Sequence, residues 1–417
     1  MKINRAQLLR ALSMAVKIAP KGGNIPVLCG VCLDGQRQMV TATDLDVYLE
    51  YPVEITDFEH TVTENPPEDD WLEGLTKAQL VDLCEYAGVE VDKNAKVAGI
   101  RDTLTIAANE AATKNVAEVF CLPAKRCKEI VDSCKEETIE ITRNDVSENF
   151  LERQMVRIGE NFRDLAILPA DEFPIFVHPD TEEDGAGTTI ISRENLLQVL
   201  PATAKEESGF RLSVVYFNHE HGEAVATDGH RIHIVKAEVA EKTWSLQAYI
   251  AKILVGFIGK EDSLSFKVGE RYVVTKIDGA TLSIRPPEGK FPDYRTVIND
   301  PEQTITVKKS DALPALKQAA ILTDATYGGI RVSFNGHVDV SVINPERGTY
   351  EKQAAIACRG KVDPTVEVGM RLKYVLDCIG TAPKDDTEIE IGVTDNSRGV
   401  HFKHGTDFHG MVMPMRL

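Results

Sequence analysis

Hydrophobic and polar positions follow the same order in three stretches of the chain. Each stretch opens with a short strand and a helix whose leucines recur at helical spacing, at residues 2–12, 190–200 and 307–316. β-rich segments follow, and the first two contain the similar strands 40–45 and 224–229. This order predicts a threefold internal repeat.

A second helix is expected later in each stretch, at residues 124–134, about 246–258 and 371–379. Strands with alternating polarity come after it, such as residues 138–142 and 388–392. Each repeat is therefore predicted to be α+β, with two helices laid on antiparallel sheet.

The repeats close on related segments, residues 167–174, 285–292 and 411–414. Residues 178–187 are acidic and contain glycine, as is typical of a linker between domains. We therefore expect three domains, with boundaries at residues 1–180, 186–300 and 301–417.

Residues 60–114 do not fit the repeat. They begin with an acidic tether at residues 61–70, Thr76 and Gln79 form a predicted capping box, and a second short helix is expected at residues 95–104. The first helix has an apolar stripe and a glycine stop, formed by Leu80, Leu83, Cys84, Ala87 and Gly88. The segment resembles small SAP-like or helix–extended–helix modules, several of which bind nucleic acid. A DNA-binding role, a protein-binding role and a merely decorative role all stay open.

Composition narrows the class of protein. The chain has 417 residues, no leader-like start and no apolar run long enough to span a membrane, so we expect a soluble cytoplasmic protein. Cys29 and Cys32 form a C-x-x-C in residues 27–33, which are expected to be a buried strand, and no second pair of ligands accompanies them, so no metal is expected. The scattered cysteines are expected to be reduced thiols: Cys29, Cys32, Cys84, Cys121, Cys127, Cys134, Cys358 and Cys378.

The formal net charge is −18, which opposes long-range attraction to nucleic acid. Any contact with DNA must come from a local basic surface.

Five short segments, in order, carry a resemblance to a known family: residues 226–231, 291–295, 319–322, 374–377 and 412–417. With them the chain resembles the bacterial-type beta sliding clamps, the processivity subunits of DNA polymerase III, over nearly all residues outside 60–114. The resemblance implies three DNA-clamp domains per protomer and a head-to-tail homodimeric ring around duplex DNA. It implies tethering of polymerase, clamp loader and repair proteins without catalysis or a cofactor. The extra segment would suit a phage or mobile-element clamp in a bacterial cytoplasm.

The resemblance places helices around the central hole, where cations would make weak, sequence-independent phosphate contacts. Ordinary solvated helix faces are the alternative for each of these cations. Lys21 and Asn24 match a loop that touches DNA in the family, although Asn24 lacks the usual charge. The residues expected to face DNA are Arg5, Arg10, Lys17, Lys21, Asn24, Lys125, Arg126, Lys128, Arg193, Lys205, Lys252, Lys317, Arg371 and Lys373.

The family docks short partner peptides in a groove between its second and third domains. Thr296 and Arg371 depart from the family pattern at the rim, and both Leu212 and Val214 are candidates where a loop is shortened. For the C-terminal tail alone, an ordinary edge strand is the alternative. The resemblance assigns to this groove Leu212, Thr227, Gly229, His230, Arg231, Ile232, Pro292, Val297, Tyr327, Tyr374, Val412, Met413, Pro414, Met415, Arg416 and Leu417.

The protomer interface implied by the resemblance involves Phe162 and Leu165 with Ile321 and Leu322, for which burial in the core is the competing interpretation.

An enzymatic role for His230 is disfavoured, because no Gly-x-Ser-x-Gly, His-Glu-x-x-His or phosphate-binding glycine loop accompanies it. Three hypotheses remain: a working replication clamp, a clamp-fold paralogue that only binds partners, and a DNA-binding adaptor driven by the inserted segment.

Overall fold

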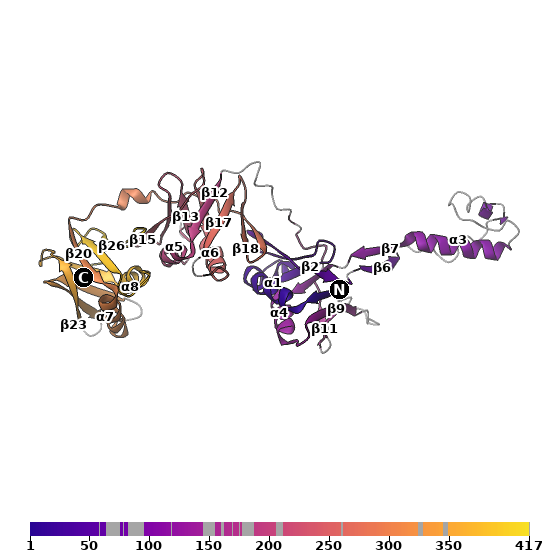
Figure 1. The fold of residues 1–417 in the computed structure, drawn as a ribbon, viewed down its shortest axis with the longest axis horizontal. Coiled ribbons are helices and arrows are strands. Elements are labelled where there is room, and N and C mark those ends of the chain that lie inside the picture. The colour runs from indigo at the N-terminus through magenta and orange to yellow at the C-terminus, as the bar shows by residue number, and fades with distance from the viewer. Residues whose placement is uncertain are drawn as a thin grey trace. The chain divides into compact units, whose positions relative to one another are not determined.

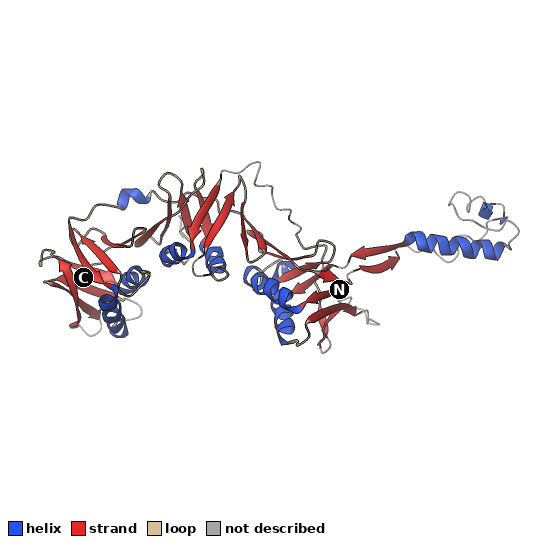
Figure 2. Cartoon of the chain, viewed as in Figure 1, coloured by secondary structure: helices blue, strands red, loops and turns tan. Residues whose placement is uncertain are grey.

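The chain consists of two compact units, Met1–Ile175 and Phe176–Leu417. The computed structural model describes residues 1–57, 59–63, 76–77, 79–81, 96–117, 119–144, 155–159, 162–168, 170–174, 176, 187–205, 212–259, 262–323, 328–344 and 349–416. Figure 1 shows the elements of each unit, and Figure 2 distinguishes helices from strands.

The first unit places two helices beside antiparallel strands. Helices α1 and α4 pack against each other, and α1 also contacts β2, β3 and β4. One sheet has the order β11-β10-β9-β1-β5, and β4-β3-β2-β8 are neighbours in another. The elements are β1 (Lys2–Asn4), α1 (Arg5–Ile18), the 3-10 helix η1 (Pro26–Cys29), β2 (Gly30–Asp34), β3 (Met39–Thr43), β4 (Val47–Pro52), β5 (Ile55–Thr56), β6 (Glu59–Thr63), α3 (Val97–Ala112), β7 (Thr113–Ala117), β8 (Val119–Pro123), α4 (Ala124–Ser133), β9 (Thr138–Asn144), β10 (Met155–Ile158) and β11 (Phe162–Ala166).

The second unit contains the elements of the other two repeats. β12-β17-β18-β19 are consecutive neighbours, and a larger sheet runs β16-β13-β14-β15-β27-β26-β25-β20-β23-β22-β21-β24. The elements are β12 (Thr188–Ser192), α5 (Arg193–Val199), η2 (Leu200–Ala202), β13 (Val214–Asn218), β14 (Glu223–Thr227), β15 (Arg231–Lys236), β16 (Trp244–Gln247), α6 (Ala248–Val255), β17 (Ser263–Val268), β18 (Val273–Ile277), β19 (Ala280–Ile284), η3 (Tyr294–Val297), β20 (Gln303–Lys308), α7 (Lys309–Leu322), β21 (Gly329–Phe334), β22 (His337–Asn344), β23 (Thr349–Gly360), β24 (Glu367–Arg371), α8 (Leu372–Gly380), β25 (Glu388–Val393), β26 (Val400–His404) and β27 (Phe408–Val412).

The antiparallel α+β arrangement confirms the predicted fold class. The strand-then-helix openings are β1–α1, β12–α5 and β20–α7, and the second helices are α4, α6 and α8. Side-chain caps fix two of the starts, because Asn4 accepts from the backbone N–H groups of Ala6 and Gln7, and Ser192 accepts from Asn195.

The first residue of each opening helix is a cation that reaches the end of the second helix. Arg5 donates to the carbonyl oxygens at positions 131 and 132, at 3.1 and 2.7 Å. Arg193 donates to the carbonyl of Val255 at 3.3 Å. Lys309 donates to the carbonyls at positions 380 and 382, at 3.3 and 2.5 Å. Because helix C-termini carry unpaired carbonyls and partial negative charge, this cation joins each helix pair, and its recurrence supports the repeat.

Some local predictions were wrong. Residues 244–247 form strand β16, so the helix expected from about 246 begins at Ala248. The apolar segment around Cys29 is a 3-10 helix up to that residue, because Pro26 at its first turn favours a helical start over a strand.

The inserted segment is held by a strand pair. β6 and β7 pair antiparallel in residues 59–63 and 113–117, so the expected tether at 61–70 begins as a strand. Thr76 and Gln79 form the predicted capping box, with Gln79 Oε1 accepting from the Thr76 N–H at 3.0 Å. The second helix, α3, extends to Ala112, well beyond the expected end. Leu83, Cys84, Ala87 and Gly88 lie outside the described residues.

Candidate functional site

A tight turn between β14 and β15 organises the region around His230. The Thr227 hydroxyl accepts from the Gly229 N–H at 3.1 Å and donates to the Arg231 carbonyl at 2.6 Å. Asp228 Oδ1 accepts from the N–H groups of His230 and Arg231, at 3.0 and 3.1 Å. Gly229 has φ +87, a left-handed conformation that glycine adopts without a steric penalty. The turn exposes His230 and directs Arg231 inward.

Arg231 is 5% exposed and connects two parts of the second unit. Its guanidinium forms ion pairs with Asp228 Oδ2 at 3.1 Å and with Asp377 on α8, and it donates a hydrogen bond to the Pro201 carbonyl in η2. It also lies 4.4 Å from the centre of the Tyr374 ring. Arg231 therefore fixes β15 to α8, and Asp377 is a partner that the sequence did not reveal.

His233, two residues later on β15, makes the next contact with α8. Its Nδ1 lies 2.7 Å from the Gln198 carbonyl, so Nδ1 must donate and Nε2, 3.3 Å from Cys378 Sγ, must accept. Burial lowers the pKa of His233 to about 3 and raises that of the Cys378 thiol. Both groups are neutral structural residues.

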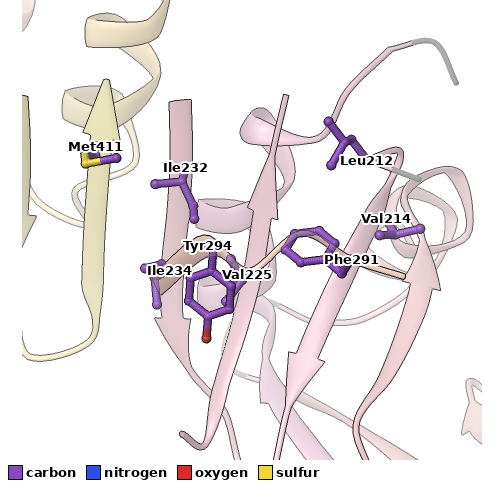
Figure 3. Close-up of a cluster of buried hydrophobic side chains, with 8 residues drawn as sticks. All are labelled: Leu212, Val214, Val225, Ile232, Ile234, Phe291, Tyr294 and Met411. Carbon is purple, nitrogen blue, oxygen red and sulfur yellow. The ribbon is translucent and has the colours of Figure 1, made fainter. Parts of the chain in front are cut away.

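An apolar cluster lies beneath this turn and is called here the junction cluster. It brings together side chains from β13 and the loop before it, from β14, β15 and β27, and from the segment before and within η3 (Figure 3). Met411 comes from β27, which pairs with β15 through Arg231↔Val412 and Ile232↔Met411. The members are Leu212, Val214, Val225, Ile232, Ile234, Phe291, Tyr294 and Met411. Both candidates at the shortened loop, Leu212 and Val214, are thus buried in it.

A polar network holds the η3 segment on the sheet. The Tyr294 hydroxyl accepts from Asn218 at 2.9 Å and donates to Glu223 at 3.0 Å, and Arg295 pairs with the same carboxylate at 2.5 Å. Burial raises the pKa of Tyr294 to about 12. The segment is therefore fixed at both its apolar and its polar side.

The C-terminal tail continues along the same surface. The Met413 N–H donates to the His230 carbonyl at 2.8 Å, and the Met415 N–H donates to the Gly369 carbonyl at 2.9 Å. Arg371 lies 5.5 Å from the Tyr374 ring, and the His230 ring lies 6.4 Å from it. The tail thus lies between the β14–β15 turn and β24.

The residues assigned to the groove fall into two groups. Those buried beneath the surface are Leu212, Thr227, Arg231, Ile232 and Val412. Those exposed or half-buried are Gly229, His230, Pro292, Val297, Tyr374, Met413, Pro414, Met415 and Arg416. Tyr327 and Leu417 lie outside the described residues. The second group is the surface that a partner would meet.

The cations expected to face DNA include some that bind helix ends and others that are exposed. Arg5 and Arg193 donate to carbonyls at the ends of α4 and α6, so both have a structural role besides any contact with phosphate. Lys309, which the sequence did not single out, has the same structural task. Lys128 is half-buried, and the exposed residues are Arg10, Lys17, Lys21, Asn24, Lys125, Arg126, Lys205, Lys252, Lys317, Arg371 and Lys373.

Two of the four residues expected at a protomer interface are exposed apolar side chains at the end of α7. Ile321 is 82% exposed and Leu322 is 48% exposed. Leu165 is half-buried, and the side chain of Phe162 lies outside the described residues. Core burial is therefore wrong for the α7 pair.

The cysteines and the helices show no further site in the described part of the chain. Cys32 and Cys121 are register partners on β2 and β8, and burial raises the pKa of each thiol to about 12. Among the described residues, no group of His, Cys, Asp and Glu has an arrangement suited to a metal ion. No described helix is long and apolar enough to cross a membrane.

The chain aligns from end to end with known proteins. It is 23% identical to the beta sliding clamp of Pseudomonas aeruginosa, over 100% of this chain and 99% of that protein. The chain is homologous to the beta sliding clamps. The Escherichia coli beta sliding clamp is 23% identical over 64% of the chain and 74% of its own length. No protein-family model matches.

Solved structures agree on the fold. The DNA polymerase sliding clamp of P. aeruginosa superimposes with a TM-score of 0.73 and 20% identity, covering 100% of this chain and 99% of that one. The sliding clamp of Bartonella birtlesii bound to griselimycin gives 0.74 at 18% identity, covering 100% and 99%. The chain therefore has the sliding-clamp fold.

Proposed function

We propose that this chain is a working sliding clamp, a non-catalytic protein that encircles duplex DNA as a homodimer and tethers a replicative polymerase. Its end-to-end homology to beta sliding clamps is the observation that carries the proposal. The repeated helix pairs support it, because each is joined by the same cation-to-helix-end contact. The bacterial cytoplasm, in a host or a phage-infected cell, is the proposed location.

Exposed cations on the helices are the proposed DNA contacts. α1 supplies Arg10 and Lys17, α4 supplies Lys125 and Arg126, and α6 supplies Lys252. Exposed side chains can touch phosphates weakly and move on, as a sliding protein requires. An overall charge of −18 then keeps the remaining surface from binding DNA nonspecifically.

Partner peptides are proposed to dock on the surface over the junction cluster. Met413 and Val297 are exposed apolar groups at 39% and 54%, and Met side chains adapt to varied partners. Buried Arg231 and the Tyr294 network hold the surrounding turn and segment rigid. Rigid apolar anchors at the centre of a site provide most of its affinity.

Trapping on circular DNA tests the main function. The protein, loaded by a clamp loader onto nicked circular duplex, should stay bound in high salt and leave when the circle is linearised. Native mass spectrometry should give a dimer, and replacing exposed Ile321 with Glu should give a monomer that is not retained. A wild-type protein that binds partner peptides but is never trapped would instead be a clamp-fold paralogue.

Deletion of residues 413–417 tests the docking surface. The deletion should abolish binding of the clamp-binding peptide of a replicative polymerase and leave the dimer intact. Unchanged peptide affinity would place docking elsewhere.

The inserted segment is tested by its own deletion. Since β6 and β7 pair in residues 59–63 and 113–117, replacing residues 64–112 with a short turn keeps the strand pair. We propose that DNA trapping survives this change. Loss of all DNA or partner binding would favour the adaptor hypothesis.

A further inference from the structure

A cleft of about 770 Å³ opens in the second unit next to the junction cluster. Its lining comes from Tyr216 and from three segments, residues 242–245, 268–272 and 285–291. None of these residues belongs to the groove, the DNA-facing set or the protomer interface that the resemblance to clamps implies, so the cleft is additional to the docking surface.

The charges of the lining favour a negative ligand. Four cations line the cleft, Lys242, Arg271, Arg285 and Lys290, against the two carboxylates of Glu270 and Glu288. Arg285 and Glu288 lie 3.8 Å apart, and Lys242 donates to the backbone carbonyl of Glu270. In a chain with a net charge of −18, this local excess of positive charge distinguishes the cleft.

The cleft is continuous with the junction cluster through two aromatic rings. Phe291 and Tyr216 stack with centroids 4.5 Å apart and planes within 5°. Phe291 belongs to the cluster and Tyr216 packs against it, yet both also line the cleft. The cleft and the junction cluster therefore share the Phe291 and Tyr216 rings and are adjacent.

The shape of the lining suits an extended backbone. β16 is the outermost strand of its sheet in the described part of the chain, and its residues Trp244 and Ser245 line the cleft. An unpaired strand edge offers backbone donors and acceptors to an added strand. Pro286 and Pro287 stiffen the opposite loop, and Gly289 has φ +134 within it.

We propose that this cleft binds an extended acidic segment of a partner protein, adjacent to the apolar residues that the partner places over the junction cluster. The inference rests on the proposed docking function. A peptide fits better than nucleic acid, because Glu270 and Glu288 would repel a continuous line of phosphates, whereas a peptide places its carboxylates selectively.

Peptide binding measured by fluorescence anisotropy on the full-length protein tests the inference. The probes are the clamp-binding peptide of a replicative polymerase alone, and the same peptide with a short flank of glutamates or of glutamines at either end. With the flank at one of the two ends, the glutamate peptide should bind about fivefold more tightly at low salt than the glutamine peptide flanked at the same end. High salt should remove the difference. The double substitution R271Q/K290Q should also remove it, without changing the affinity of the unflanked peptide.

A charge-matched control is R359Q/K361Q, which removes two exposed cations that do not line the cleft. It should retain the preference for glutamates. Equal affinity for both flanks, or a preference that survives R271Q/K290Q, would overturn the inference while leaving the docking function standing. Failure of the unflanked peptide to bind would overturn both. Competition by a single-stranded oligonucleotide that R271Q/K290Q abolishes would assign the cleft to nucleic acid instead.

Discussion

Two turns, one in each unit, have the same local hydrogen bonds but different surroundings. In residues 43–47 and 227–231, the threonine hydroxyl accepts from the N–H two residues later. The aspartate Oδ1 accepts from the N–H groups two and three residues beyond it. Short polar side chains that bind their own backbone account for the shared shape.

The strands that follow these turns differ in what they bury. The first unit buries Val47 and Leu49, each 1% exposed, where the second buries Arg231 and His233. Both polar side chains contact α8, at Asp377 and Cys378. The same turn therefore leads to an ordinary apolar core in one unit and to a specific attachment of another helix in the other, because buried polar groups require fixed partners.

Removing the buried cation should break this attachment. Arg231→Val, which copies Val47, leaves the Asp228 and Asp377 carboxylates without their partner and should lower the free energy of unfolding by about 3–5 kcal/mol. Denaturant titration measures the change. The exposed counterpart Arg398→Val, which loses ion pairs to Glu302 at 3.5 Å and to Asp395 at 3.6 Å, should change it by less than about 1 kcal/mol. Comparable losses in the two variants would show that Arg231 is not the attachment.

Acid should weaken the second unit through His233. Its pKa is about 3 when folded and near 6.5 when unfolded, so between these values the unfolded chain binds a proton that the folded chain does not. The contribution of His233 to stability is thus complete above pH 6.5 and falls by about 1.4 kcal/mol per pH unit below it. His233→Leu, which copies Leu49, should reduce this acid dependence in denaturant titrations at several pH values, whereas exposed His219→Gln should not. An unaltered pH profile for His233→Leu would contradict this account.

The residue with positive φ in each turn, Gly229 or Leu45, should affect stability less than Arg231 or His233 does. Gly229 has φ +87 with open space where a β-carbon would lie, so Gly229→Ala adds backbone strain alone and should destabilise by about 1 kcal/mol. Leu45 already has φ +78, and Leu45→Gly should change stability by less than about 0.5 kcal/mol, because relief of strain offsets lost chain entropy. Thermal denaturation compares the stability of the two variants. Equal losses of stability would show that backbone strain at this position does not explain the effect of Gly229→Ala.

The smallest effect is expected for Arg371, at the edge of the proposed docking surface, where a substitution should change only peptide affinity. Arg371 and Arg231 both lie over the Tyr374 ring, but Arg371 is exposed. Arg371→Asn should leave the melting temperature unchanged and weaken binding of an acidic partner peptide about two- to threefold, as expected for an exposed charge. If the variant binds an acidic peptide as tightly as the unchanged protein does, and the affinity for a neutral peptide is also unchanged, Arg371 has no part in partner selection.

The sequence by itself determined the α+β repeat and the helix that opens each repeat, because hydrophobic periodicity acts within a few residues. It did not predict the turn at Asp228, since residues 224–229 were expected to be a strand, and that strand ends at Thr227. The start of the helix at Ala248 was predicted too early, because the preceding residues belong to β16, and only their pairing with β13 shows that they form a strand.

The tertiary structure alone decided which polar residues are structural and which face outward. Arg5, Arg193 and Arg231 are indistinguishable in the sequence from exposed cations such as Arg10. Their partners lie 126, 62 and 146 residues away. Helix-end carbonyls and carboxylates so remote leave no local pattern, because burial and pairing depend on how distant segments pack. For the same reason the basic cleft between residues 242–245, 268–272 and 285–291 became visible only once the chain had folded.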